Sequence, residues 1–182
     1  MKINFMLDLE TVGLTPGSAI ISIALVPFGF AGFSPATAPY YEKINFQSSA
    51  AKLSVDSTVL DWWAMQDPEV RNEAFSGTKS LEVVLQEISD YLASFKCDPV
   101  IWGKGSDFDN VLLAEAYDRC DIKLPWNFRN NRCFRTLTAI FPYHSFDKIN
   151  TKKHSALEDA KHQAEWAESI FLSVVAPFQL EH

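Results

Sequence analysis

The sequence predicts an α/β domain in which one mixed, five-stranded sheet is flanked by helices. Three stretches rich in Ile, Val and Phe follow one another before the first helical segment, which favours antiparallel strands. Beyond residue 56 the apolar residues recur at helical spacing, and short apolar runs alternate with these helices, which favours parallel strands. The 182 residues, of which 47% are hydrophobic and 21% charged, suit one folded domain with a sizeable core.

The first part of the expected sheet lies at residues 2–8, 19–28 and 40–46. A turn signal at 13–18 separates the first two strands, and the Gly-, Pro- and Ser-rich stretch 29–39 indicates a long hairpin loop before the third. Because no helical pattern intervenes, the three strands should form an antiparallel meander.

Helices and two short strands make up the rest of the expected fold. In chain order they are a helix at 57–65 with Asp56 or Ser57 as N-cap, a helix at 80–95, a strand at 99–102, a helix at 108–119, a strand at 132–136, a short helix that ends at Pro142, and a last helix from His154 to about Val174. This order matches the ribonuclease H-like arrangement, in which three antiparallel strands are followed by parallel ones. We expect one domain at 1–179, because residues 180–182 match the start of a vector-encoded His tag.

The charge balance of the chain is acidic. There are 16 Lys and Arg residues against 23 Asp and Glu residues, which gives a net charge of −7 and a pI near 5.0. This balance excludes affinity for nucleic acid that is supplied simply by a strongly basic surface. It does not exclude nucleic acid as a substrate, because an acidic chain can approach phosphates through metal ions.

Cysteine usage and the apolar runs bear on the compartment. Cys97, Cys120 and Cys133 are odd in number and form no CxxC pair, so we expect free thiols in a reducing compartment. The longest apolar run, 18–33, is shorter than the ~20 residues that a bilayer-spanning helix needs. No signal-peptide pattern is visible, because acidic residues interrupt the first apolar run. We therefore expect a cytoplasmic protein with no membrane partner.

Two acidic residues, Asp8 and Glu10, close the first predicted strand. Residues two apart in a strand point to the same face, so these carboxylates should lie side by side while Leu7 and Leu9 face a core. Such a pair repels unless one group takes up a proton or a divalent cation joins them, and hard oxygen ligands suit Mg²⁺ or Mn²⁺. The alternative is a solvated strand end with two acids of no special function.

Two further acidic signals follow along the chain. Asp107 and Asp109 come after the glycine turn that ends a central strand, where ligand sites gather, although both also suit the start of a helix. His154 precedes Asp159 by five residues at the start of the last helix, where an imidazole can lie beside a metal-bound water; the alternative is a pair of surface residues. Small residues on that helix would let it pack close to the sheet: Ala156, Ala160 and Ala164.

Together these signals carry a resemblance to a known family. Residues 8–11, the Phe108-Asp109 pair and the spacing of His154 and Asp159 resemble, in order and distance, the three motifs of the DEDDh 3′→5′ exonuclease superfamily. The stretches around Trp62-Trp63, Asp67-Pro68 and Trp102-Gly103 are similar to the RNase T-like branch, which contains RNase AS and phage exodeoxyribonuclease A.

The second motif departs from the family pattern. Many members have His-Asn where this chain has Lys104-Gly105, so only the Phe-Asp half of the motif matches. Asp107 therefore remains an alternative to Asp109, and the Phe-Asp-Asn frame favours Asp109.

The resemblance implies a nuclease that hydrolyses single-stranded ends or 3′ overhangs of RNA or DNA to nucleoside 5′-monophosphates. It implies two Mg²⁺ or Mn²⁺ ions held by the carboxylates of Asp8, Glu10, Asp109 and Asp159. Asp8 would bridge both ions, and His154 would be the general base that takes a proton from the attacking water.

The resemblance also implies substrate contacts at Thr11, Gly13, Leu14 and Phe108. Trp62 and Trp63 could stack on bases, but aromatic residues at helical spacing also serve a core. Basic residues near the third motif could meet phosphates or could form a solvated face: Arg129, Arg132, Arg135, Lys152 and Lys153.

Other functions and partners remain open at this stage. A nuclease-like module could bind nucleic acid without cutting it, or the chain could be the proofreading partner of a polymerase. The RNase T-like resemblance raises the expectation of a homodimer with a single-stranded 3′ end as its partner. No residue can be identified that would contact the 2′-hydroxyl, so the sequence does not distinguish an RNA substrate from a DNA substrate.

Overall fold

A five-stranded sheet in the order β3-β2-β1-β4-β5 lies at the centre of the computed structural model, which describes residues 2–29, 37–144 and 154–175. The strands are, in chain order, β1 (Lys2–Thr11), β2 (Ile20–Phe28), β3 (Tyr40–Lys43), β4 (Asp98–Gly103) and β5 (Asn131–Cys133). β2 runs antiparallel to both β1 and β3, whereas β4 runs parallel to β1 and β5 parallel to β4. The predicted mixed sheet is confirmed.

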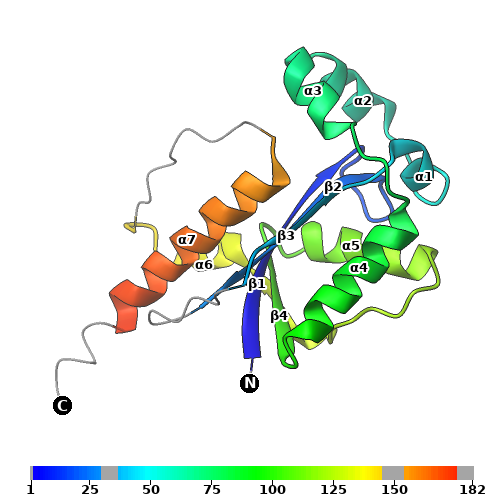
Figure 1. Cartoon of the computed structure of the whole chain (residues 1–182). Coiled ribbons are helices and arrows are strands. Elements are labelled where there is room, and N and C mark those ends of the chain that lie inside the picture. The colour runs from blue at the N-terminus through cyan, green and yellow to red at the C-terminus, as the bar shows by residue number, and fades with distance from the viewer. Residues whose placement is uncertain (1, 30–36, 145–153, 176–182) are drawn as a thin grey trace.

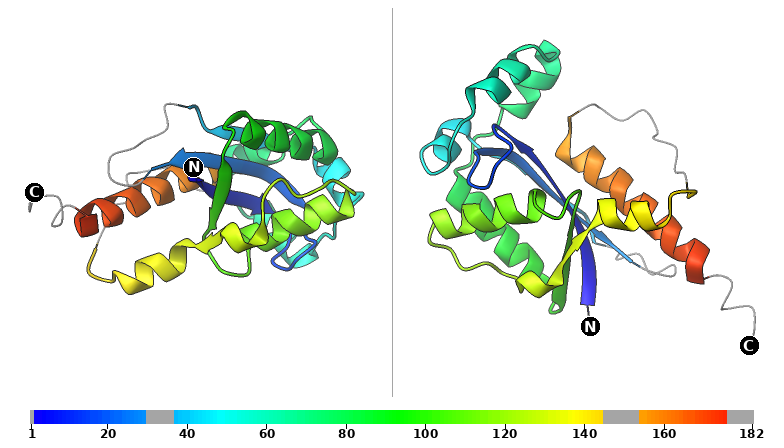
Figure 2. Two further views of the ribbon diagram at one scale, coloured as in Figure 1. Left: turned by 90° about the horizontal axis from the view of Figure 1, so that it is seen from below. Right: turned by 180° about the vertical axis from the view of Figure 1, so that it is seen from behind.

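Helices cover both faces of this sheet (Figures 1 and 2). In chain order they are α1 (Phe46–Ala50), α2 (Ser57–Ala64), α3 (Pro68–Ala74), α4 (Leu81–Ser94), α5 (Asp109–Arg119), the 3₁₀ turn η1 (Phe128–Asn130), α6 (Phe134–Ile140) and α7 (Ala156–Val175). Helices α4 and α5 lie on one face, α6 and α7 lie on the other, and α1 to α3 gather near the end at which β1 finishes (Figure 1).

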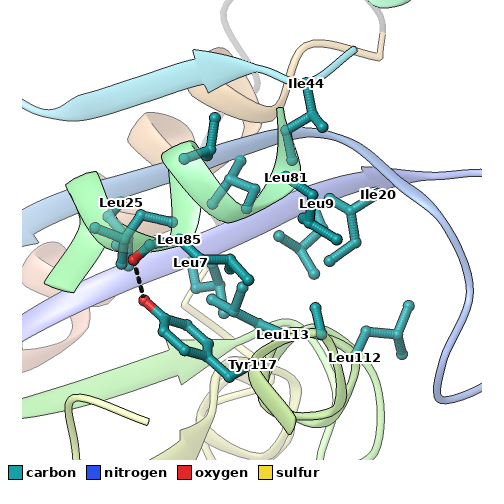
Figure 3. Close-up of a cluster of buried hydrophobic side chains, with 14 of the residues drawn as sticks. Leu7, Leu9, Ile20, Leu25, Ile44, Leu81, Leu85, Leu112, Leu113 and Tyr117 are labelled. Carbon is teal, nitrogen blue, oxygen red and sulfur yellow. Dashed lines mark hydrogen bonds between the residues drawn. The ribbon is translucent and has the colours of Figure 1, made fainter. Parts of the chain in front are cut away.

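Alternation along β1 divides its side chains between two cores. Leu7 and Leu9 pack into the cluster that α4 and α5 cover, as predicted. In this cluster the Tyr117 hydroxyl donates a hydrogen bond of 2.8 Å to the Leu85 carbonyl oxygen, so the polar end of a buried ring is satisfied (Figure 3). Met6 enters the second cluster, under α7. The face of β1 that carries Asp8 and Glu10 is therefore the face that α7 covers.

Small residues let α7 lie close to the sheet. Ala156, Ala160 and Ala164 are buried in the second cluster, which confirms the prediction from their spacing. Trp166 of the same helix packs edge-on against Phe134, with ring centroids 5.5 Å apart. This close packing fixes the position of the first turn of α7, and hence of Asp159.

Two short helices correct the expected course of the chain between β3 and α4. The third strand ends at Lys43 rather than at residue 46, because the Asn45 side chain accepts a hydrogen bond from the Ser48 amide and starts α1. Helix α3 was not predicted, although Asp67 caps it and Pro68 stands at its first position. The expected N-cap of α2 is confirmed as Asp56.

Two boundaries near the site were also predicted wrongly. The strand expected at 132–136 ends at Cys133, whose sulfur accepts from the Thr136 amide and begins α6. The last helix begins at Ala156 rather than at His154, because His154 has a left-handed backbone with φ of 59°. Most of the expected 29–39 loop lies outside the described residues.

The structure also bears on the thiols and on membrane-spanning helices. All three cysteines are free thiols, as predicted. Within the described ranges, no helix combines the length and the apolarity needed to cross a bilayer.

Candidate active site

Three carboxylates meet where β1 passes under the first turn of α7. Asp8 and Glu10 share a face of β1, and Asp159 comes from α7. One oxygen from each of these three groups lies within 4.8 Å of the other two, which is close enough for all three to hold one cation. Asp159 is distant from Asp8 and Glu10 in the sequence, and the packing of α7 on the sheet brings the three together.

The fourth predicted carboxylate, Asp109, is the first residue of α5. Its side chain is buried, and its Oδ2 accepts a hydrogen bond of 2.8 Å from the backbone amide of Lys104. It lies near enough to Asp8 and Glu10 to raise the pKa of both. Asp107, the alternative, is exposed. The geometry therefore favours Asp109 as the member of the cluster.

Gly103 makes room for this arrangement at the end of β4. A Cβ atom at this position would collide with Oδ1 of Asn110 and would come within 3.2 Å of Oδ2 of Asp109. Asn110 in turn donates a hydrogen bond of 3.0 Å to the Ile101 carbonyl oxygen and ties the start of α5 to β4. The glycine is required by close approach, since the first turn of α5 presses directly on the strand.

Burial, together with the charges of neighbouring acids for two of them, raises the pKa values of three carboxyl groups at the site. Burial, followed by the charges of its three acidic neighbours, holds the pKa of Asp8 well above its usual range, and a hydrogen bond from Gln163 acts against this shift. Burial and the charges of Asp159 and Asp109 raise the pKa of Glu10 to about 8. Burial raises the pKa of Asp109 to about 6, against the lowering effect of backbone amides. Three acids whose pKa values are raised in this way are suited to a cluster that is neutralised by cations.

Gln163 supports the cluster and was not identified from the sequence. Its side chain is buried, and its Nε2 donates a hydrogen bond of 2.8 Å to Oδ1 of Asp8. It lies one helical turn after Asp159, so the i, i+4 spacing would have placed it on the same side of α7. We infer that its amide orients one oxygen of Asp8.

His154 stands just before α7 and packs against two aromatic rings. Its imidazole lies edge-on to Trp62, with ring centroids 4.9 Å apart, and 6.1 Å from Trp63. The left-handed backbone places the ring on the α2 side of the site, away from the helical path of α7. His144, which lies after the end of α6, contacts Ser169, and His162 of α7 contacts Trp166.

A cavity of about 470 Å³ opens beside Glu10. Three of the predicted substrate residues line it, namely Thr11, Leu14 and Phe108. Gly13 does not line it, but its carbonyl oxygen accepts a hydrogen bond of 2.7 Å from the Thr11 hydroxyl and shapes the turn on the rim. Leu14 is 68% exposed, so an apolar side chain stands free at the mouth of the cavity.

The two adjacent tryptophans have different roles, which the sequence could not separate. Trp63 is buried, and its Nε1 donates a hydrogen bond of 3.0 Å to the Thr11 carbonyl oxygen. Trp62 is 38% exposed, and both tryptophans line the cavity together with Val59. Trp63 therefore supports the end of β1 as well as the cavity wall, while Trp62 presents the more exposed ring.

The sheet order and the helices on both faces are those of the ribonuclease H-like arrangement expected from the sequence, and the acidic cluster lies towards the end of the central strand β1. The chain belongs to the family described as the 3′-5′ exoribonuclease Rv2179c-like domain, whose model matches residues 3–171.

A curated relative and several solved structures resemble the chain. The exodeoxyribonuclease of Enterobacteria phage T4 is 25% identical over 126 residues, which are 62% of this chain and 54% of the relative, so the chain spans about half of that protein. The nuclease domain of 3′hExo, a DEDDh family member bound to rAMP, superposes with a TM-score of 0.63 at 14% identity, with 94% of this chain and 92% of that chain covered. Exonuclease I of E. coli, in complex with a dA16 oligonucleotide, superposes with a TM-score of 0.67 at 13% identity, with coverage of 97% and 42%. At these identities the structural likeness shows the fold.

Proposed function

We propose that the chain removes nucleotides one at a time from single-stranded 3′ ends or 3′ overhangs and releases nucleoside 5′-monophosphates. The observation that carries this proposal is the meeting of Asp8, Glu10 and Asp159 beside a cavity of about 470 Å³. The cluster supplies oxygen ligands for cations, and the cavity is large enough to accept the terminal nucleotide. RNA is the preferred substrate in this proposal, because the matched family is described as exoribonucleases and covers nearly the whole chain.

The residues present fit a pair of divalent cations. Asp8, Glu10, Asp109 and Asp159 offer only hard oxygen donors, which suit Mg²⁺ or Mn²⁺. When bound, the two cations would activate a water molecule and neutralise the negative charge that develops on the phosphodiester. Asp8 would be among the carboxylates that hold the cations, and the hydrogen bond from Gln163 would keep its carboxylate oriented.

His154 is the proposed general base. Imidazole is the side chain that most readily exchanges protons near neutral pH, and the residue stands next to the first turn of α7 from which Asp159 projects. The edges of Trp62 and Trp63 limit the directions in which the ring can turn. A proton taken from the attacking water would be held on this ring until it returns to solvent.

The cavity beside Glu10 is the proposed place of the 3′-terminal nucleotide. The Trp62 and Phe108 rings give the base an apolar surface, and Leu14 on the rim can insert between this base and the next one. Stacking on aromatic rings contributes about 1–3 kcal/mol per base and does not depend on base identity. We therefore expect little sequence preference at the terminal position.

A pair of matched variants tests the proposal. Asp159→Asn removes one negative ligand from the cluster, whereas Asp118→Asn makes the same change at an exposed position of α5. With Mg²⁺ and end-labelled RNA and DNA of one sequence, we expect the first variant to lose at least 100-fold in rate and the second to match the wild type. Chelation of the metal should stop all shortening, and RNA should be shortened faster than DNA.

Two results would overturn the proposal. Shortening that continues in the presence of a chelator would remove the role of the cations. Tight binding of the oligonucleotide by the wild type with no turnover would support the alternative of an idle binding module. Co-purification with a polymerase would instead assign the same chemistry to proofreading. The expected homodimer is a separate matter, which size-exclusion chromatography tests.

A further inference from the structure

Three arginines of this acidic chain lie close together in the sequence and have no acidic partner among the described residues. Glutamates pair with other cations of the chain: Lys43, Lys52, Lys79, Arg119 and Lys161. Within the described ranges, no carboxylate lies at ion-pair distance from Arg129, Arg132 or Arg135, all of which are exposed. Three of the chain's five arginines thus gather within seven residues as unneutralised charge.

These arginines follow the edge of the sheet. β5 is an edge strand, and its register with β4 pairs Arg132 with Trp102 and Cys133 with Gly103. Helix α6 continues directly from β5, next to the end of β4 (Figure 2). The three arginines, which we call the arginine edge, therefore lead away from the end of the sheet at which the carboxylates meet.

The arginine edge begins beside the loop that supports Asp109. Nη1 of Arg135 lies 4.0 Å from the place where a Cβ of Gly105 would stand, and the neighbouring Lys104 amide holds the Asp109 carboxylate. A second cavity of about 390 Å³ opens here, between Gly105 and Ser106 on one side and Arg135 and Thr136 on the other. The 104–108 loop thus separates this second cavity from the one that Phe108 lines.

The other two arginines are held in defined positions. The guanidinium of Arg132 donates hydrogen bonds of 2.9 and 2.8 Å to the carbonyl oxygens of Arg129 and Asn131. The guanidinium of Arg129 lies over the ring of Phe128, 5.5 Å from its centroid, and this ring is 69% exposed. Less side-chain entropy is lost when such a guanidinium meets a phosphate, because part of the ordering is already present.

We propose that the arginine edge binds the phosphates of the nucleotides upstream of the bond that is cut. This inference rests on the proposed function, which places the 3′-terminal nucleotide in the cavity beside Glu10. The strand would pass from the carboxylates over the 104–108 loop and continue along Arg135, Arg132 and Arg129, with Phe128 available for stacking. Guanidinium groups bind phosphate strongly and without regard to base, so this surface sets the length of single strand that the enzyme prefers.

Neutralising two of the arginines tests the proposal. The variant Arg132→Gln/Arg135→Gln should lower kcat/KM for a 16-nucleotide RNA by about 10-fold or more, while kcat/KM for a 3-nucleotide RNA and kcat on both should stay within about 2-fold. The control Lys96→Gln/Lys123→Gln makes the same change in charge at two exposed lysines beyond the C-terminal ends of α4 and α5, and it should leave both substrates unaffected.

Binding without turnover gives an independent readout. By fluorescence anisotropy of the labelled 16-nucleotide RNA without added Mg²⁺, the slope of log Kd against log salt concentration should fall by about 1.4, since each phosphate contact on a single strand contributes about 0.7. The variant Arg132→Lys/Arg135→Lys keeps the charges and should retain most of the slope.

The proposal for the arginine edge would be overturned if the Arg132→Gln/Arg135→Gln variant lost kcat/KM equally on the short and the long RNA. An unchanged slope of log Kd against log salt concentration would overturn it as well. Failure of the wild type to shorten either RNA would overturn the proposed function instead, and the anisotropy measurement would still decide the arginine edge.

Discussion

Two carboxylates of the site, Asp8 and Asp109, accept hydrogen bonds from particular neighbours. Gln163 donates to Asp8, and the Lys104 amide donates to Asp109. These donors lower the pKa values of the two acids, but burial outweighs them, and the pKa values of Asp8, Glu10 and Asp109 are all raised. In the proposed function, bound cations would offset the repulsion between the acids and would couple metal binding to stability.

The raised pKa of Glu10 predicts a specific pH dependence of the metal-free protein. A carboxyl group whose pKa rises from 4.5 to about 8 on folding binds more protons in the folded state within that interval. Its contribution to the free energy of unfolding therefore falls as the pH rises from about 4.5 to about 8. Without metal, Glu10→Gln should be more stable than the wild type at pH 8.5 by about 1–3 kcal/mol, because one pKa unit corresponds to about 1.4 kcal/mol and partial exposure reduces the full value.

Urea unfolding in the presence of a chelator, at pH 5 and at pH 8.5, measures this difference. The advantage of the variant should shrink as the pH falls to 5. The same advantage at both pH values would show that charge on Glu10 has no part in it.

Among the helices and strands, α7 decides whether the site forms. Its small residues set how closely it approaches β1 and β2, and Asp159 lies next to one of them, Ala160. Enlarging Ala160 should therefore push the first turn of α7 away from the sheet. Overpacking of this kind costs about 1–3 kcal/mol in a well-packed core.

Ala160→Leu should lower the free energy of unfolding by this amount and lower kcat by at least 10-fold, because it separates Asp159 from Asp8 and Glu10. Ala93→Leu, at an exposed position of α4, is the matched control and should change neither quantity by a comparable amount. Urea unfolding and rates with a labelled RNA measure the two effects. A destabilised Ala160→Leu protein with full kcat would show that the position of Asp159 does not depend on the docking of α7.

Elements that depend on local sequence patterns were predicted correctly, whereas features that depend on contacts between distant segments were not. Alternation in β1 correctly separated Leu7 and Leu9 from Asp8 and Glu10, because that pattern is local to one strand. The end of β5 was predicted wrongly, because Cys133 and Phe134 suit a strand as well as a helix start. The cavity could not be predicted from the sequence, because it depends on how α2 and the 104–108 loop pack against β1.

For the molecule as a whole, the net charge of −7 has a local explanation. Four of the acids gather at one site, and two divalent cations bound there would offset four negative charges. The unpaired arginines stand on the adjoining edge of the sheet, so positive charge remains where a phosphate chain would leave the site. The acidity of the chain is therefore compatible with nucleic acid as a substrate, provided that contact is confined to the site and this edge.

The polarity of cleavage is the property on which this view of the molecule depends. An RNA of about 20 nucleotides, labelled in one sample at its 5′ end and in another at its 3′ end, is incubated with the protein and Mg²⁺. The proposed function predicts a ladder that shortens one nucleotide at a time from the 5′-labelled RNA, and immediate release of a labelled nucleoside 5′-monophosphate from the 3′-labelled RNA. Internal fragments, or first release of the 5′-terminal nucleotide, would contradict it.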